Sequence, residues 1–488
     1  MNYLSLDFVG FVAVAFLAYY IMPKKVRWGV LLLASLGFYA LFDLKYVAFL
    51  LFAALSTYGT ALLLGKGKLK GLLISLCILA NAGVWFYIKE LSWALKTAGR
   101  VFGKLGMDIT LPTISNLIVP VGISYFTLQA IAYLVDVAKG KVQAEKNPLK
   151  YLLFLSWFPA IVQGPISRYD QLGPQLTNPN KFSLDQTRDG LVLVLYGLTK
   201  KMVIADRIAI FANYCFNNHA DLQGVILYLG AIAYSLQLYA DFSGCVDICR
   251  GVSRLFGVEL IENFRSPYGS RSIKEFWNRW HISLSSWLKD YIYIPLGGNR
   301  KGTFVKYCNI FIVFLVSGLW HGAGFQFFAW GIMHAAFQIG GAITDPLRRK
   351  IKDRLDITKD SFVERVLQTL VTFHLVALAW IVFRSSGLGT AITYCRNMFD
   401  EAQPWVLFDG SLFTHGVSQT AFNVLLVNIV LLFVAERKFP TSDSFVTALT
   451  NNHLIIRWFV YIVLIFNVLL FGVYGSGYDL SGFLYGGF

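Results

Sequence analysis

The feature that most constrains this chain is a series of apolar runs of membrane-spanning length, which follow one another almost from end to end. Several runs are short or interrupted by glycine, proline or charge. We expect those to be tilted or re-entrant, because irregular backbone is tolerated at membrane depth only where protein or water covers it. The pattern predicts an all-α polytopic membrane protein with about 11 transmembrane helices. The runs lie at residues 7–22, 29–43, 46–65, 71–88, 116–135, 150–164, 188–214, 223–240, 304–319, 323–343, 366–384, 420–435 and 455–475.

Composition supports the membrane assignment. Hydrophobic residues make up 56% of the 488 residues and charged residues 15%, whereas soluble domains carry about 25% charged residues. No internal repeat or flexible linker divides the chain, so we expect a single polytopic domain over residues 1–488. The opening sequence MNYLSLDF lacks a basic region and a cleavage signature, so the first run is predicted to be a retained span.

The net charge of +15 comes mainly from short basic loops between the apolar runs. Such loops mark the cytoplasmic side of membrane proteins, and they predict an extracytoplasmic N-terminus and no nucleic-acid partner. A further role in attracting anionic lipid or a donor's phosphates is open. The loops carry Lys24, Lys25 and Arg27; Lys66, Lys68 and Lys70; and Lys139, Lys141, Lys146 and Lys150.

Residues 237–300 differ from the rest because they are rich in Trp, Tyr, Arg and His although they lie between apolar runs. The block is too charged to face lipid and too aromatic for a plain solvated loop. We therefore predict a protein-covered or water-filled cavity at membrane depth. The alternative is an interfacial aromatic belt. Inside the block, FWNRWHISLSSW interleaves aromatic residues with polar ones, among them Asn278, Arg279, His281 and Ser283.

The segment LQLYADFSG places Gln237 and Asp241 four residues apart, on one helix face. An acidic residue near membrane depth is functional or ion-paired. Arg250 and Arg279 are the partners that we consider for Asp241. A salt bridge that only braces the cavity is an equally good interpretation.

A second candidate is the sequence around Trp320 and His321, which lies between two apolar runs. An imidazole at this depth needs a cavity or a partner. Nearby glycines, Gly318, Gly322 and Gly324, are expected to leave the backbone uncrowded so that a substrate can approach. The alternative is a structural histidine with satisfied hydrogen bonds. His334, thirteen residues later and about 220° around a helix, is expected to be structural.

These residue types suit general-base catalysis. A neutral histidine beside a hydroxyl acts as a general base, worth about 10²–10⁴ in rate. Acyl transfer from a thioester needs no protein nucleophile, because the thiolate leaves readily. We therefore assign His321 as the candidate base, with His281 and Asn278 as orienting or polarising groups. The sequence has no GxSxG, HExxH, Walker A or CxxC motif, so we predict no bound cofactor and no metal site.

The chain resembles the membrane-bound O-acyltransferases, and most closely their bacterial branch that acetylates polysaccharides. The similarity extends from the first spans to about residue 390. The long block ending in IPLGGNR is the most specific part. The matching motifs are VPVGISYFTLQAIAYLVDV (119–137), FPAIVQGPISRYD (158–170), LQLYADFSGCVDI (236–248), NFRSPYGSRSIKEFWNRWHISLSSWLKDYIYIPLGGNR (263–300) and SGLWHGAGFQFFAWGIMH (317–334).

This resemblance implies a catalytic core near residues 116–345, with His321 as the principal catalytic histidine and His281 as the second. The motifs also supply supporting residues: Arg279, Trp280, Ser283 and Trp320. The implied fold is a ring of tilted helices around a thin centre, with a cytoplasmic and an extracytoplasmic funnel.

The resemblance also implies a function at a bacterial plasma membrane. The donor would be acetyl-CoA, reached from the cytoplasm. The acetyl group would pass outward, through an extracytoplasmic partner of the SGNH-hydrolase type, to an exported or cell-wall polysaccharide.

Two alternatives stay open. The first is a D-alanyl transferase for teichoic acid, whose donor is a carrier-protein thioester. The second is a transporter or flippase whose polar middle is a permeation path, although this gives no reason for two histidines in Trp-rich motifs.

Overall fold

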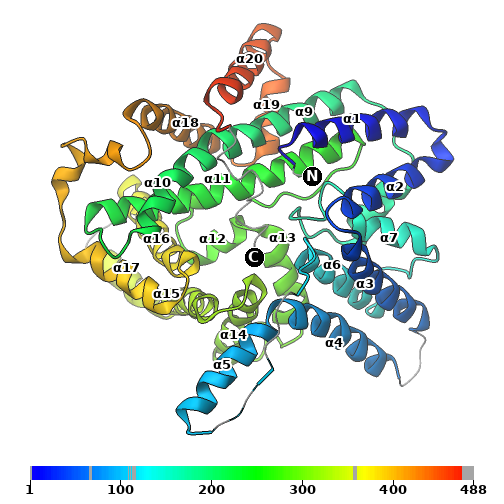
Figure 1. Ribbon diagram of the computed structural model, residues 1–488, viewed down its shortest axis with the longest axis horizontal. Coiled ribbons are helices and arrows are strands. Elements are labelled where there is room, and N and C mark those ends of the chain that lie inside the picture. Colours follow the sequence, from blue (N-terminus) through cyan, green and yellow to red (C-terminus); the bar gives the residue numbers. More distant parts are fainter. Residues whose placement is uncertain are drawn as a thin grey trace. The chain divides into compact units, whose positions relative to one another are not determined.

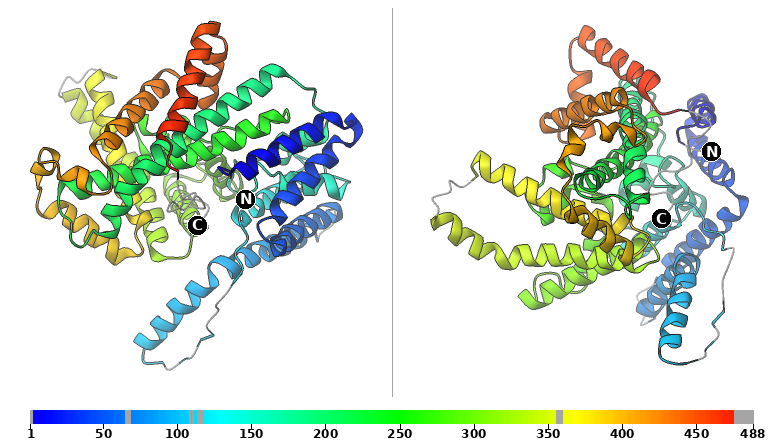
Figure 2. Two further views of the ribbon diagram at one scale, coloured as in Figure 1. Left: turned by 45° about the horizontal axis from the view of Figure 1, so that its top comes forward. Right: turned by 60° about the vertical axis from the view of Figure 1, so that its left-hand side comes forward.

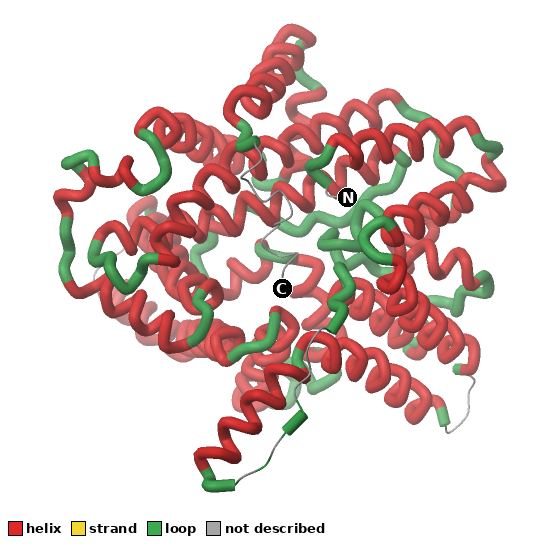
Figure 3. Tube along the Cα trace, viewed as in Figure 1, coloured by secondary structure: helices red, strands yellow, loops and turns green. Residues whose placement is uncertain are grey.

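The computed structural model describes residues 3–64, 69–107, 109, 111–112, 117–354 and 360–474. Within these residues the regular structure is helical (Figure 3), and β-type pairing is limited to an isolated antiparallel bridge between Phe264 and Trp280. The predicted all-α class is therefore confirmed. The basic residues Lys66 and Lys68 lie outside the described residues.

The chain forms two compact units. Within the described residues, the first contains 3–194 and 248–261, and the second contains 195–247 and 262–474. Two helices, α9 (Leu184–Leu198) and α11 (Val225–Leu255), contain residues of both units. The expectation of one polytopic domain, with a core at 116–345, stays a prediction.

The first unit is built from the N-terminal helices, most of which are labelled in Figure 1. Three of them, α1, α3 and α7, begin after Ser5, Asp43 and Asn147, whose side chains accept a hydrogen bond from the first turn and so satisfy a free N–H group of the helix. Its helices are α1 (Leu6–Ile21), α2 (Arg27–Ala40), α3 (Leu44–Leu63), α4 (Lys70–Lys89), α5 (Leu91–Lys104), α6 (Ile123–Ala138), α7 (Pro148–Ser156) and α8 (Tyr169–Thr177), with a 3₁₀ turn, η1, at Lys24–Val26.

The second unit holds both candidate histidines. Two of its segments are π-helical, η2 (Thr199–Ala205) and η4 (Lys289–Tyr293), and three are 3₁₀ turns, η3 (Pro267–Gly269), η5 (Pro404–Leu407) and η6 (Ser411–Thr414). Its α-helices are α10 (Asp206–Asn217), α12 (Ile273–Arg279), α13 (Ile282–Leu288), α14 (Thr303–His321), α15 (Phe325–Arg354), α16 (Phe362–Arg384), α17 (Leu388–Asp400), α18 (Gln419–Lys438), α19 (Ser442–Thr450) and α20 (Leu454–Phe471).

Seven helices of the described chain are long and apolar enough to cross a membrane, namely α3, α4, α11, α14, α16, α18 and α20. Two shorter apolar helices, α1 and α6, accompany them. The predicted count of about 11 spans and the ring with two funnels stay predictions.

Two predicted segments differ from the structure. The run at 150–164 forms only the nine-residue helix α7, and the irregular backbone that follows to Arg168 is buried throughout, as membrane-depth backbone must be. The expected interfacial helix at 345–365 is instead the end of α15, which continues through Pro346 to Arg354, and the start of α16 at Phe362. Residues 355–359 lie outside the described chain.

Candidate functional site

A short turn between α12 and α13 positions His281. Trp280 is extended after α12 and pairs with Phe264. The Arg265 N–H donates to the Arg279 carbonyl over 3.0 Å. Asn263 braces the other side, because its carbonyl accepts from the Ile282 N–H and its side-chain oxygen accepts from the Ser283 N–H. Asn263 therefore caps the N-terminus of α13, although it lies eighteen residues before His281 in the sequence. Helix caps usually come from the residue next to the helix.

His281 itself holds a left-handed backbone conformation, with φ 45° and ψ 54°. Such a conformation is uncommon for a residue with a side chain, and it clusters at functional sites. The side chain is 1% exposed, and its ring packs edge-to-face on Phe242 at 4.9 Å. Burial lowers the pKa of His281 to about 3, so the imidazole is neutral at physiological pH.

His321 is the last residue of α14 and is 2% exposed. Its ring packs edge-to-face against Trp330 at 5.0 Å and against Phe383 at 5.3 Å. Aromatic edges and faces of this kind stabilise a neutral ring without any counter-charge. The predicted cavity around this histidine stays a prediction.

Trp320 connects the two candidate histidines. The centroid of its ring lies 6.0 Å from that of His281 and 4.9 Å from that of His321. His281 and Trp320 are 39 positions apart in the sequence, so this shared contact comes from the fold. The structure therefore brings together His281 and His321, the two histidines that the sequence singled out, because both contact the indole of Trp320.

The aromatic chain continues to His334. Trp330 contacts both His321 and His334, the latter at 4.9 Å. The Trp277 indole N–H donates to His334 Nδ1 over 3.2 Å. This bond, in a fully buried position, agrees with the structural role expected for His334.

The glycines near His321 serve helix packing, which corrects the expectation that they leave room for a substrate. A Cβ atom on Gly318 would lie 2.4 Å from the Phe327 carbonyl oxygen, and one on Gly322 would lie 2.9 Å from the Phe327 ring. At Gly324 the space is occupied by the side chain of Gln326. Gly318 therefore lets α14 and α15 approach closely, as small residues do between membrane helices.

Asp241 forms an ion pair with a residue that the sequence interpretation did not consider. Its carboxylate lies 2.5 Å from Lys201 Nζ, which also contacts Asp206 at 2.8 Å. The neighbouring Lys200 pairs with Asp247. All five side chains are buried, and buried charges of this kind persist only when they are paired.

The π-helical turn η2 explains how two consecutive lysines both reach α11. A π turn adds a residue to the helix and changes the direction of the side chains after it. The two helices also approach closely, because a Cβ on Gly244 would lie 2.8 Å from the Gly197 carbonyl oxygen. The signal for this pair was present in the sequence, since two adjacent lysines inside an apolar run mark a functional or paired site.

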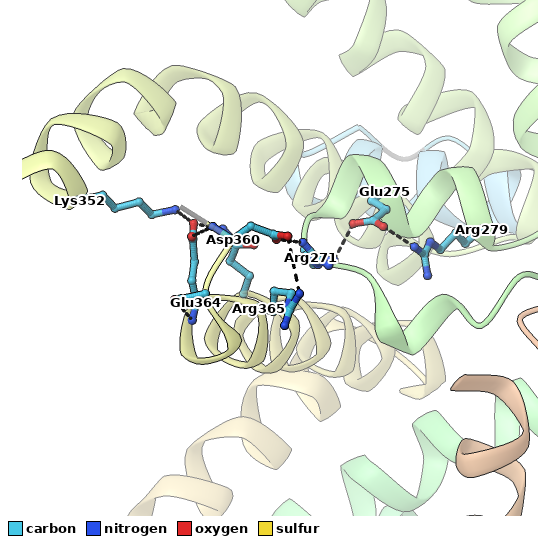
Figure 4. A network of polar contacts seen from close by, with 9 residues as sticks. Arg271, Glu275, Arg279, Lys352, Asp360, Glu364 and Arg365 are labelled. Carbon is cyan, nitrogen blue, oxygen red and sulfur yellow. Dashed lines mark hydrogen bonds and ion pairs between the residues drawn. The ribbon is translucent and has the colours of Figure 1, made fainter. Parts of the chain in front are cut away.

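Two predicted site residues lie apart from the aromatic chain. Asn278 is exposed on α12. Arg279 is half-buried and pairs with Glu275 over 2.5 Å, at one end of the ionic network in Figure 4. In that network Glu275 also accepts from the Arg271 N–H, and Arg271 pairs with Asp360.

The remaining predicted residues are buried. Trp280 stacks on Phe276, with ring centroids 5.4 Å apart. Gln237 and Ser283 are 5% and 0% exposed, and within the described chain neither the Gln237 side-chain oxygen nor the Ser283 hydroxyl has a hydrogen-bond partner.

Comparison with known proteins gives a consistent picture. The membrane-bound O-acyltransferase family matches residues 31–373. A probable alginate O-acetylase of Pseudomonas putida is 35% identical over 389 residues, which cover 78% of this chain and 76% of the relative. A peptidoglycan O-acetyltransferase of Helicobacter pylori is 34% identical over 426 residues, covering 80% and 78%. A teichoic acid D-alanyltransferase of Bacillus subtilis is 31% identical over 280 residues, covering 55% and 69%.

Proposed function

Because this chain belongs to the membrane-bound O-acyltransferase family, we propose that it moves an acetyl group from cytoplasmic acetyl-CoA toward an exported or cell-wall polysaccharide. The chain is a membrane O-acyltransferase. The identity of the donor, the polymer and the direction of transfer are the parts that we propose. Family membership also removes the support for a transporter, since the relatives are named for group transfer.

The observation that carries the proposal is the pair of buried imidazoles of His281 and His321 on the Trp320 ring. The family's chemistry needs a base beside the acceptor hydroxyl. His321 ends α14, and a base at a helix end is held in place by the helix. His281, in its left-handed turn, is the auxiliary group that orients or polarises the substrate.

The reaction balances with one base. The His321 imidazole accepts the proton of the acceptor hydroxyl while the hydroxyl oxygen bonds to the thioester carbonyl carbon. The carbon–sulfur bond then breaks, and the departing thiolate takes the proton from the imidazolium. No group of the protein needs to be acylated in this sequence, and no redox step occurs.

Acetyl transfer is favoured over D-alanyl transfer by the extent of the similarity. The acetyltransferase relatives align over 78–80% of this chain, and the D-alanyltransferase over 55%. D-alanyl transfer from a carrier-protein thioester is the second candidate. We further propose a bacterial plasma-membrane location with an extracytoplasmic N-terminus. We also assign the final step to an extracytoplasmic partner of the SGNH-hydrolase type, as the family resemblance suggests.

The decisive test is His321→Ala in membranes supplied with acetyl-CoA labelled in the acetyl group. We expect transfer to the exported polymer to fall about 10²–10⁴-fold, with unchanged amounts of protein in the membrane. The matched control is His374→Ala, because His374 lies on α16 outside the aromatic chain. Normal acetylation by His321→Ala would remove that residue from its role.

Separate experiments test the identity of the donor and the auxiliary role of His281. Membranes given a D-alanyl carrier thioester in place of acetyl-CoA should show no transfer, and transfer would favour the second candidate. His281→Ala should lose less activity than His321→Ala. Full activity in His281→Ala would leave that histidine a structural role only.

A further inference from the structure

Helix α18 (Gln419–Lys438) contacts the region around the His281 turn, although it lies beyond residue 373, where the family match ends. It packs against α10 and η2 of the same unit, and Figure 2 shows it beside α10. Its apolar sequence contains a single acid, Glu436, which is 8% exposed. An acid in a helix of membrane-spanning length is functional or paired, so its contacts indicate what this helix does.

The side chain of Glu436 holds a tyrosine that packs beside the His281 turn. The Tyr239 hydroxyl donates to Glu436 Oε1 over 2.5 Å. The centroid of the Tyr239 ring lies 5.8 Å from that of Phe264 and 6.0 Å from that of Trp280. Phe264 and Trp280 form the isolated β-bridge that directly precedes His281. Glu436 therefore fixes a ring that supports this bridge.

The backbone at the end of α18 holds the same bridge from a second side. The Ser266 hydroxyl lies 3.1 Å from the carbonyl oxygen of Glu436 and 3.1 Å from that of Pro440, within donating distance of both. The residue before it, Arg265, donates its N–H to the carbonyl of Arg279, the last residue of α12. The end of α18 and the turn that follows α12 are therefore joined through this short segment.

The backbone around the bridge adopts conformations that need outside support. Ser266 and His281 are both left-handed, with φ of 41° and 45°. They are two of the four non-glycine residues with positive φ in the described part of the chain. Residues with side chains keep this conformation only where the surrounding structure over-determines it. The contacts of Glu436 with Tyr239 and of the α18 end with Ser266 provide such support.

We propose that Glu436 is a positioning residue for His281. By accepting the hydrogen bond from Tyr239, it keeps the Tyr239 ring against Trp280 and so holds the His281 imidazole in one orientation. The inference rests on the proposed function, in which His281 orients or polarises the substrate. Glu436 contacts neither the substrate nor the reacting atoms in this role. It gives a part of the chain outside the family match a task in the reaction.

Nuclear magnetic resonance of the histidines tests the positioning directly. The full-length protein is labelled with ¹³C and ¹⁵N in its seven histidines and studied in nanodiscs, and the His281 signals are those that disappear in His281→Gln. The Phe242 ring packs edge-to-face on His281, so reorienting the imidazole changes its chemical shifts. Because Glu436→Leu removes the acceptor, we expect the His281 signals to move or broaden. Unchanged His281 signals would overturn the proposal.

Two further variants separate this hydrogen bond from a general loosening of the helix. Glu436→Gln keeps an acceptor oxygen for the Tyr239 hydroxyl, so His281 signals and acyl transfer should stay close to those of the wild type. The matched control is Asn428→Leu, because Asn428 also lies on α18 and is 8% exposed but accepts a hydrogen bond from Asn467 of α20. It should leave the His281 signals in place. Displaced signals in either variant would contradict the proposal.

A double-mutant cycle shows whether Glu436 acts through His281. Glu436→Leu alone should lower kcat for acyl transfer roughly 10-fold with little change in KM, because a displacement of about 1 Å can cost about 10²-fold. The loss should not exceed that of His281→Ala. In a His281→Ala background the same substitution should cause no further loss. A loss by the same factor in both backgrounds would show that Glu436 only stabilises the fold, which rules the proposal out.

The two measurements together distinguish this inference from the proposed function. If the His281 signals move in Glu436→Leu while His281→Ala keeps full acyl transfer, Glu436 positions His281, and the auxiliary role of His281 in the reaction fails. If His281→Ala loses transfer while the signals stay fixed in Glu436→Leu, the auxiliary role stands and the positioning role fails.

Discussion

Two buried polar regions of the second unit differ in the groups that surround their polar side chains. In the first, His281 and His321 lie among aromatic rings and share the Trp320 indole. In the second, Lys201 lies against Asp241 and Asp206. A neutral imidazole can sit among rings, but a charged ammonium needs carboxylates around it.

The comparison distinguishes residues expected to act in catalysis from residues expected to hold the helices together. A histidine packed among aromatic rings can serve as a proton acceptor, and its removal should cost catalysis more than folding. An ion pair buried between helices fixes the position of those helices, and its disruption should cost folding more than catalysis. Asp241 is followed directly by Phe242, whose ring packs on His281, so the ionic region also supports the histidine.

The largest expected effect is on catalysis. His321→Gln keeps a polar side chain of similar length but supplies no base, so we expect acyl transfer to fall about 10²–10⁴-fold. The midpoint of thermal unfolding in detergent should change little. A large fall in the unfolding midpoint with only a modest loss of transfer would reverse the assignment of the two regions.

Lys201→Met should destabilise the protein by about 3–5 kcal/mol, because two carboxylates stay buried without their cation. Denaturant unfolding in detergent measures the loss. Lys201→Met combined with Asp241→Leu should recover part of it, since the charge of Asp241 is then removed as well. A single variant as stable as the wild type would show that Lys201 is not the cation that these acids require.

Gly331→Ala tests whether the glycines of α14 and α15 serve packing. Its Cβ would lie 2.5 Å from the Phe314 carbonyl oxygen, so we expect a loss of about 1–3 kcal/mol in unfolding free energy. Gly340→Ala on the same helix meets no atom within 4 Å and should be neutral or stabilising by up to about 1 kcal/mol. Equal behaviour of the two variants would restore the expectation of free space.

The last effect concerns the pH dependence of stability. Burial lowers the pKa of His281 to about 3 from an ordinary value of 6.5, so between these values the unfolded chain binds a proton that the folded chain excludes. His281 therefore favours folding above pH 6.5, and stability is lost as pH falls, by up to about 1.4 kcal/mol per pH unit. His281→Gln should have a shallower slope of unfolding midpoint against pH between 6.5 and 4. An identical slope would mean that the ring is hydrated.

The candidate site was recoverable from the sequence only in part. His281 and His321 stand out because polar residues among apolar and aromatic ones are visible locally. Asn278 and Arg279 were grouped with them by adjacency, yet the first is exposed and the second pairs with Glu275. In a seven-residue helix such as α12, neighbouring residues point in different directions, so closeness in sequence does not place them at one site.

By itself the sequence determined the helical class, the apolar helices and the family, because hydrophobic runs and contiguous motifs are local properties of a chain. Only the tertiary structure decided that Trp320 touches both candidate histidines, that Lys201 meets Asp241 forty residues away, and that Gly318 admits a neighbouring helix. These contacts join separate helices, and each depends on the direction in which a side chain leaves its helix and on how closely two helices pack. Neither the direction of a side chain nor the distance between two helices can be read from the order of the residues alone.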